Sequence, residues 1–214
     1  MCQPASFVVT KKEVFWSKNS ESHTDIIEEF KLKEQDVRGN YTFVRVEIVP
    51  PDKDYTLPFK KWHYQLDQDL KPVWYDAKEV EKRCRAKLKG WRKAKVVMPN
   101  ESRKEIANDH IVAIYGNVEL LSGSSKVDYM NGSSKVGSMH GSSKVDSMYG
   151  SSKVGSMYGS SKVGYMTDSS KVDAAMARSI ICSYNNLDPK TLKSSQAVLI
   201  DYTKDPVVCY VGKK

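Results

Sequence analysis

The C-terminal half of the chain repeats one short segment, Gly-Ser-Ser-Lys-Val-Asp/Gly-x-Met-x, six times between Gly123 and Met176 with few changes. Its valine recurs every nine residues, at Val127, Val136, Val145, Val154, Val163 and Val172. A unit this short cannot bury its apolar side chains alone, so successive copies must stack on one another. The nine-residue period predicts a parallel β-solenoid.

The residue order within each copy predicts which side chains face the interior. The second serine and the valine are two residues apart, so they share the inward face of a strand, and the lysine between them points outward. The methionine suits an irregular interior gap, and Gly or Asp after the valine tolerates a tight corner. This small-x-aliphatic-Gly/Asp order resembles the hexapeptide motif of left-handed β-helices.

The same spacing continues beyond the six copies. Further steps along it lead to Val118, Ile181, Leu199 and Val208 for the valine slot, and to Val112, Leu121, Tyr184, Tyr202 and Val211 for the methionine slot. We therefore expect a solenoid from about Ile111 to Val211, with degenerate end coils as caps. The pattern fails near Lys190, where Pro189 and the preceding Asn-Asn pair predict a loop.

Either two or three copies can complete one coil, which gives a flattened or a triangular solenoid. The residue after the valine alternates between Asp and Gly over the first four copies, and this favours two copies per coil. Gly164 and Asp173 in the last two copies break the alternation.

Stacking would place equivalent lysines about 4.8 Å apart in outward columns. The candidate binding ladder consists of Lys126, Lys135, Lys144, Lys153, Lys162 and Lys171. Such a row of like charges requires solvation, bridging by Asp128, Asp146 and Asp173, or an anionic partner. The competing interpretation is that the lysines keep exposed strands from pairing with other chains.

Aromatic residues at the variable positions of the repeat adjoin the lysines. Tyr129, Tyr149 and Tyr158 are candidate binding residues, with His140 and Tyr165 at similar positions. Exposed Lys and Tyr suit protein recognition and can also stack nucleobases. Stacking of the rings along the solenoid surface is an equally good explanation.

The sequence pattern of residues 1–108 predicts a small α+β domain, and residues 109–214 form the predicted solenoid. A strand is expected over 41–49, where side chains alternate, and another over 62–66. Asp76 begins the best helix, which runs to about Gly90 or Lys95, and Glu79 would complete a capping box. The apolar side of that helix comprises Val80, Cys84, Leu88 and Trp91.

The other faces of this helix are basic. They carry Lys82, Arg83, Arg85, Lys87, Lys89, Arg92 and Lys93. A face of this kind contacts phosphates or an acidic protein, or it is simply solvated. No helix-turn-helix pair, zinc-ligand spacing or aromatic RNA-binding motif accompanies it.

Composition narrows the class of protein. The chain has 214 residues, 40% hydrophobic and 28% charged, and a net charge of +8, which leaves an acidic partner open and argues against a DNA mimic. Its four cysteines have neither close pairing nor metal-ligand spacing, and no leader or membrane-length apolar run is evident. We expect a cytoplasmic protein that needs no cofactor or metal.

Catalytic motifs are scarce. His63, Asp67, Asp69 and Asp76 lie close in sequence, but Asp76 already serves as a helix cap and the first two aspartates end a strand. Nucleotide-binding loops, metalloprotease motifs and nucleophile elbows are missing from the sequence. We therefore expect no enzyme. An acyltransferase-like activity is the third-ranked alternative, and it would need a catalytic histidine between coils of different chains. Only His140 lies inside the repeats.

The N-terminal region resembles a module of uncharacterised phage and prophage proteins. The similarity rests on Val46-Glu-Ile-Val-Pro-Pro-Asp, Trp62 followed by Asp67-Gln-Asp69, Pro72-x-Trp74, the Ser-Ser-Lys-Val repeats and Gln196-Ala-Val-Leu-Ile-Asp-Tyr. It implies a mobile-element origin, and small proteins of that kind often bind and block a host protein.

We therefore expect a non-enzymatic binding protein that modulates a host protein, such as a component of a defence or nucleic-acid-processing complex. Direct nucleic-acid binding through the basic helix and the lysine ladder is the alternative. The sequence leaves the oligomeric state open: solenoid ends expose strand edges, and the segment Val207-Val-Cys-Tyr-Val could pair with a second copy.

Overall fold

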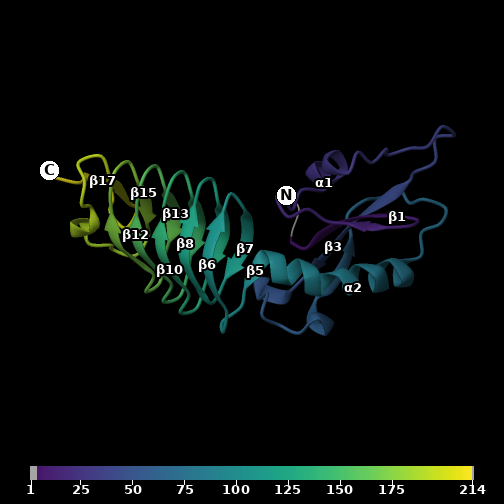
Figure 1. Cartoon of the computed structure of the whole chain (residues 1–214), viewed down its shortest axis with the longest axis horizontal. Coiled ribbons are helices and arrows are strands. Elements are labelled where there is room, and N and C mark those ends of the chain that lie inside the picture. The colour runs from purple at the N-terminus through teal and green to yellow at the C-terminus, as the bar shows by residue number, and fades with distance from the viewer. Residues whose placement is uncertain (1–3, 214) are drawn as a thin grey trace. The chain divides into compact units, whose positions relative to one another are not determined.

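A computed structural model describes residues 4–213 of the chain. It forms two compact units that divide between Ala94 and Lys95. Figure 1 labels their helices and strands along the chain. The sequence placed the boundary at 108/109, fourteen residues later, because the first coil of the solenoid does not follow the nine-residue spacing.

The N-terminal unit contains an antiparallel sheet in the order β2-β1-β3-β4. Its strands are β1 (Ser6–Thr10), β2 (Val14–Phe15), β3 (Phe43–Val49) and β4 (His63–Leu66). The alternating segment predicted over 41–49 is the central strand β3, whose Val44, Val46 and Ile48 are completely buried. The strand predicted over 62–66 is β4.

Two α-helices accompany this sheet, α1 (His23–Glu29) and α2 (Ala77–Lys95), with short 3-10 turns η1 (Pro51–Lys53) and η2 (Phe59–Lys61). Asp76 Oδ1 accepts a hydrogen bond from Glu79 N at 2.8 Å, which confirms the predicted cap of α2. The four predicted apolar residues of α2 are all buried. Trp91 packs with Trp62 and Tyr55 in an aromatic cluster at the centre of the unit.

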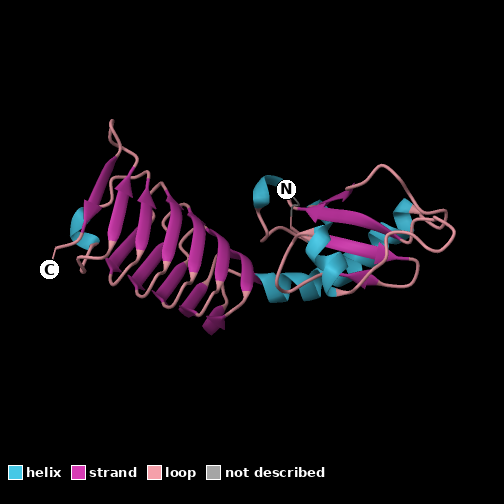
Figure 2. Ribbon diagram, turned by 90° about the horizontal axis from the view of Figure 1, so that it is seen from above, coloured by secondary structure: helices cyan, strands magenta, loops and turns pink. Residues whose placement is uncertain are grey.

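The C-terminal unit is the predicted β-solenoid, shown edge-on in Figure 2. Its strands fall into two sheets on opposite sides of the core, and their described pairs are parallel except for β16 and β17. The long sheet contains β5 (Val96–Val97), β7 (His110–Ile114), β9 (Lys126–Met130), β11 (Lys144–Met148), β13 (Lys162–Met166), β15 (Ile180–Ser183), β16 (Val198–Asp201) and β17 (Val208–Val211). The short sheet contains β6 (Ser102–Ala107), β8 (Asn117–Ser122), β10 (Lys135–Met139), β12 (Lys153–Met157) and β14 (Lys171–Ala175).

Strand register shows that two copies of the repeat complete one coil. Val145 pairs with Val127 and Val163 in the long sheet, and Val154 pairs with Val136 and Val172 in the short sheet. Successive copies therefore alternate between the sheets, and the favoured two-sided coil is correct. Over the first four copies, Asp128 and Asp146 therefore lie on the long sheet and Gly137 and Gly155 on the short sheet, whereas Gly164 and Asp173 reverse this order.

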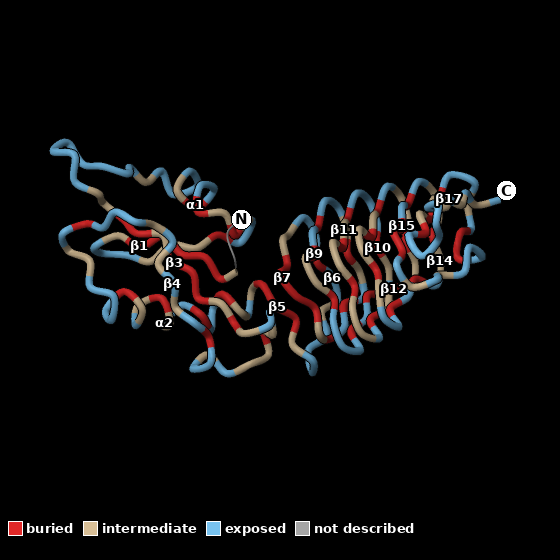
Figure 3. The backbone as a smooth tube through the Cα atoms, turned by 180° about the vertical axis from the view of Figure 1, so that it is seen from behind, coloured by how far each residue is buried: buried red, intermediate tan, exposed pale blue. Residues whose placement is uncertain are grey.

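The interior contains the side chains that the residue order predicted. The valine, the methionine and the second serine of the copies are buried. Figure 3 colours the buried residues of the chain red, and red stretches recur along the strands of the solenoid. The lysine between serine and valine is exposed or half-buried in every copy. A single apolar cluster runs through the whole stack, so each coil is stabilised by the one below and the one above.

The first coil departs from the nine-residue spacing. Strand β6 pairs with β8 at an offset of fifteen residues, and β7 pairs with β9 at sixteen. Ile114, rather than the predicted Val112, consequently aligns with Met130. These shortened coils contain no copy of the repeat motif, which is why the sequence pattern placed the start of the solenoid too late.

The last coils also differ from the prediction. A register shift between β13 and β15 aligns Met166 with Ser183, and Ser183 aligns with Asp201. Tyr184 and Tyr202 therefore lie outside the core, where 41% and 40% of their surface is exposed, and their predicted place in the methionine slot is wrong.

The chain ends in a hairpin rather than in another parallel coil. Strand β17 is antiparallel to β16, so Val208 and Val211 do not occupy the repeat slots predicted for them. The loop predicted before Lys190 is present, with Asn186 at positive φ and a 3-10 turn, η3 (Pro189–Thr191), next to β14.

Candidate binding surfaces

The predicted lysine ladder is divided between the two sheets. Lys126, Lys144 and Lys162 align on the long sheet, whereas Lys135, Lys153 and Lys171 align on the short sheet. The six lysines therefore form two columns on opposite faces of the solenoid. A flat partner could contact only one column at a time.

On the long sheet, carboxylates bridge successive lysines. Lys126 Nζ lies 2.9 Å from Asp128 Oδ1 and 3.3 Å from Asp146 Oδ2, and Lys144 Nζ lies 2.5 Å from Asp146 Oδ1. His110 Nε2 approaches the other oxygen of Asp128 at 2.9 Å. This column is therefore an alternating network of charges. Bridging by aspartates is one of the three conditions under which we expected a row of lysines to be stable.

The network changes the acidity of Asp128 and Lys126. Burial alone would raise the pKa of Asp128, but the hydrogen bonds and charges of His110 and Lys126 outweigh it and lower the pKa below its usual value of 3.8. Burial acts against the ammonium of Lys126, yet Asp128 and Asp146 together raise its pKa. The ionised forms of both groups are thus favoured in the folded protein.

The short sheet has a different charge pattern. Lys153 Nζ lies 2.5 Å from Asp173 Oδ2. Within residues 4–213, neither Lys135 nor Lys171 has a carboxylate within ion-pair distance, and on the long sheet the same holds for Lys162. Lys135 borders a shallow hollow of about 460 Å³ formed by turn residues that include Tyr115 and Asn131.

An aromatic row extends toward the C-terminal end of the long sheet. We define the tyrosine row as Tyr149, Tyr165, Tyr184 and Tyr202, whose successive ring centroids lie 5.8, 4.6 and 4.5 Å apart. The last two rings are stacked, with an interplanar angle of 5°. Backbone bonds from Tyr184 N to Met166 O and from Tyr202 N to Ser183 O fix their bases.

The three predicted tyrosines do not form one surface. Tyr149 belongs to the tyrosine row, and Tyr129 aligns with Ser147 and Tyr165 on the outer face of the long sheet. Tyr158 follows β12 of the short sheet and packs on His140, with ring centroids 4.6 Å apart. Stacking between rings is therefore real, as the competing interpretation expected.

The sequence prediction missed Tyr184 and Tyr202 as surface residues. Their separation equals one coil, and this spacing could have indicated that they stack. The nine-residue count instead assigned both to the core, because nothing in the sequence marks the register shift ahead of β15.

On α2, the predicted basic residues divide by type. The three arginines are engaged within the N-terminal unit. Arg85 bonds Glu81 Oε1, Phe59 O and Trp62 O at 2.7, 2.7 and 2.8 Å. Arg83 donates to Thr10 O at 3.2 Å, and the Arg92 guanidinium lies 4.0 Å above the Phe59 ring.

Apart from Lys95, which is buried, the lysines of α2 are exposed instead. Lys82, Lys87, Lys89 and Lys93 all lie on the surface, as does Lys78. Lys82 approaches Glu79 only at 3.9 Å, and its side chain is 82% exposed. The arginines of α2 thus stabilise the N-terminal unit through their contacts, and the exposed lysines are the accessible cations of the helix.

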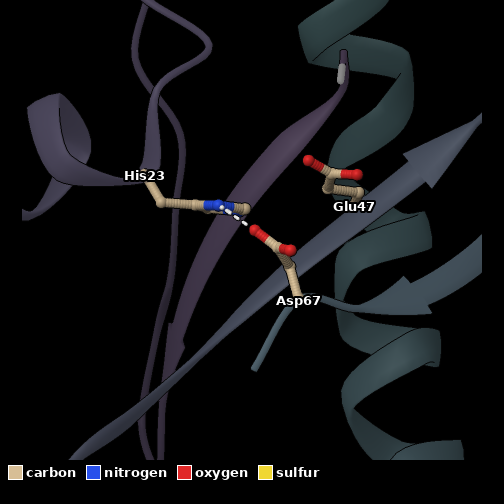
Figure 4. Close-up of side chains that lie close together, drawn as sticks. All are labelled: His23, Glu47 and Asp67. Carbon is tan, nitrogen blue, oxygen red and sulfur yellow. Dashed lines mark ion pairs between the residues drawn. The ribbon is translucent and has the colours of Figure 1, made fainter. Parts of the chain in front are cut away.

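Figure 4 shows the cluster of metal-ligating residue types formed by His23, Glu47 and Asp67. One potential ligand atom from each lies within 4.8 Å of the others, and His23 and Glu47 are buried. His23 Nδ1 lies 3.1 Å from Asp67 Oδ2, and its Nε2 lies 3.2 Å from Val46 O. Both ring nitrogens thus have acceptors, and the imidazole joins α1 to β3.

The carboxylate group suggested by the sequence is not assembled as one site. Asp67 approaches His23, Asp76 caps α2, and His63 is exposed on β4. Cys84 belongs to the core, and burial raises the pKa of its thiol to about 12, which suppresses thiolate formation.

No protein family, curated protein or solved structure matches this chain. Among the helices of residues 4–213, none combines the length and apolarity needed to cross a bilayer.

Proposed function

We propose that this chain is a non-enzymatic protein-binding module, and that the tyrosine row is the centre of its binding surface. The observation that carries the proposal is the stacked, 40%-exposed pair of Tyr184 and Tyr202 at the end of a continuous aromatic row. Two large aromatic side chains left at the surface of a well-packed solenoid are a typical recognition feature.

The surroundings of the row favour a protein as the partner. Ile180, which is 36% exposed at the start of β15 and pairs with Lys162, supplies apolar surface on the same sheet. Toward the N-terminal end of the same sheet lies the bridged network of Lys126, Asp128, Lys144 and Asp146. Protein interfaces commonly combine an aromatic and apolar centre with a polar rim.

The charge network also argues against phosphate binding on this sheet. A phosphate that approached Lys126 or Lys144 would displace or face Asp128 and Asp146. Nucleic-acid binding depends on cations whose counterions can be released, and these lysines already have carboxylate partners. The rings of the row are also held by stacking, so little conformational entropy is lost when a partner binds.

The resemblance to phage and prophage proteins supports a host protein as the partner. In this proposal the chain would modulate a bacterial host complex, such as one that acts in defence or in nucleic-acid processing, by occupying a surface of one component.

The test is affinity capture from a bacterial lysate with three tagged proteins. These are the wild type, the double variant Tyr184→Ala/Tyr202→Ala, and the matched control Tyr158→Ala, which removes a stacked tyrosine beside the short sheet. We expect the wild type and the control to capture the same protein in stoichiometric amount. We expect affinity for it to fall at least about 30-fold in the double variant, as loss of an interface hot spot would cause.

Circular dichroism must show that all three proteins contain the same amount of β-structure. Capture of nothing by the wild type would overturn the proposal, and so would equal capture by the wild type and the double variant. A partner lost from the control but kept by the double variant would move the binding surface to the short sheet.

The exposed lysines of α2 support nucleic-acid binding as a second candidate. Lys78, Lys82 and Lys89 project from the helix, and only Lys82 has a carboxylate, Glu79, near it among the described residues. Replacing all three by Ala should weaken binding to mixed DNA and RNA and reduce the slope of log K against log salt. A wild type that shifts neither nucleic acid at low salt would exclude this candidate.

A further inference from the structure

The open edge of β17 differs from both edges of the short sheet. The edge strand β6 carries Arg103, Lys104 and Glu105, and charged residues of this kind discourage strand pairing. At the opposite edge of the short sheet, η3 and Leu192 cover β14. Strand β17 has the sequence Val-Cys-Tyr-Val without any charge, and Val207 and Val211 are 52% and 59% exposed.

The hydrogen-bond pattern identifies which backbone groups of β17 face outward. Gly212 N donates to Ala197 O, and β17 pairs antiparallel with β16 in the same register. In an antiparallel ladder, alternate residues bond to the same neighbour, so Val208, Tyr210 and Gly212 face β16. Cys209 and Val211 therefore direct their backbone N–H and C=O groups toward the open edge.

We propose that two copies of this chain pair through β17, antiparallel, with Cys209 opposite Cys209 of the second copy. This register places Val211 opposite the partner's Val207, which joins the exposed valines of the two chains. The residues with outward backbone groups fall opposite one another, as a hydrogen-bonded antiparallel pair requires.

The symmetry of this arrangement explains why a second copy fits better than an unrelated strand. The exposed valines face one another only when the same segment is reversed. An isologous pair also closes, because each β17 edge is consumed by the other and no further copy can add. The long sheet would then continue across the two-fold axis.

Site-specific crosslinking tests the register directly. Paired residues in a hydrogen-bonded antiparallel position have Cα atoms about 5.5 Å apart, which a disulfide can span. In a Cys2→Ser background, mild oxidation should give a disulfide-linked dimer through Cys209, and Cys209→Ser should abolish it. Buried Cys84 and Cys182 remain as internal controls.

Two further variants make the test specific. In Cys209→Ser, the combination Val207→Cys/Val211→Cys should restore the crosslink, whereas Val211→Cys alone should not, since the two Val211 positions would be about 13 Å apart. Val211→Pro removes an outward N–H without disturbing bonds to β16. It should convert the concentration-dependent dimer to monomer in sedimentation measurements.

A wild type that stays monomeric at all concentrations, with no Cys209 crosslink, would overturn the proposal. A crosslink formed as readily by Val211→Cys alone as by the paired variant would do the same. Tyr184→Ala/Tyr202→Ala should still dimerise, so failure of dimerisation and failure of the tyrosine-row proposal are separable.

Discussion

The two sheets of the solenoid are built from alternate copies of the same nine residues, yet they present different surfaces. On the long sheet the residue after the valine is Asp128 and then Asp146, which bridge lysines. On the short sheet the equivalent residues are Gly137 and Gly155, and among residues 4–213 no carboxylate lies within ion-pair distance of Lys135. The repeated positions therefore determine the coil, and the variable positions determine what each face can bind.

The glycine turns differ in how closely they stack on the preceding coil, and this difference predicts the largest effect. Gly141 and Gly132 both have positive φ, at 69° and 63°. A Cβ on Gly141 would lie 2.8 Å from Gly123 O, whereas a Cβ on Gly132 would meet nothing within 4 Å. Only Gly141 lies tightly against a turn of the neighbouring coil.

We expect Gly141→Ala to lower the free energy of unfolding by about 2–4 kcal/mol, from backbone strain and a steric clash together. Gly132→Ala should cost only the strain, about 1–2 kcal/mol. Urea unfolding midpoints measured at equal m-values check the difference. Equal losses in the two variants would show that the stacked turns move apart without cost.

The charge difference between the sheets predicts a smaller effect. Asp128 is held by both His110 and Lys126, and its side chain is 17% exposed, whereas Asp173 has one ion pair with Lys153 and is 44% exposed. Asp128→Asn should therefore cost about 1–3 kcal/mol, because it weakens two charged contacts in a mostly buried place. Asp173→Asn should cost less than about 1 kcal/mol.

The effect of Asp128→Asn should depend on pH. The pKa of Asp128 is below 3.8 in the folded protein, so its ionised form stabilises the fold above the unfolded value, and this contribution is lost as the pH falls through the folded pKa. The difference in unfolding free energy between wild type and variant should shrink as the pH falls below about 3.8. A difference that instead grows under acid would contradict the proposed ion pairs.

The contrast between the sheets also shows how far the sequence could predict the fold. Repeated serine, valine, lysine and methionine positions were enough to predict the solenoid and the side chains of its core, because a strict period leaves few ways to stack. The Asp–Gly alternation indicated two copies per coil. The coil lengths near Ile111 and the register shift near Tyr184 were not predictable, because the chain departs at both places from the nine-residue period on which the prediction depended.

The candidate sites were predicted less well, for a physical reason. Charge along α2 was visible in the sequence, but whether Arg85 or Lys89 is accessible depends on contacts with Phe59 and Trp62, far away in the chain. Likewise, the pairing of Asp67 with His23 joins segments that no local pattern connects.

The smallest predicted effect concerns the buried serines, where the two sheets should behave alike. Ser125 Oγ donates to Ser122 O at 2.6 Å or to Ile106 O at 2.9 Å. Ser143, before the long-sheet strand β11, and Ser152, before the short-sheet strand β12, are buried, and within residues 4–213 their hydroxyls have no hydrogen-bond partner. Whether the hydroxyl of a buried serine is hydrogen-bonded therefore depends on the coil in which the serine lies, and not on the sheet to which it belongs.

Ser125→Ala should therefore cost about 1 kcal/mol, the net value of a hydrogen bond, and leave a buried carbonyl less well satisfied. Ser143→Ala and Ser152→Ala should be neutral or slightly stabilising, because each removes a buried hydroxyl that makes no bond. Thermal unfolding of the three variants provides the measurement. If Ser143→Ala and Ser152→Ala differed from each other, the difference between the sheets would extend into the core, and the variable surface positions alone could not account for it.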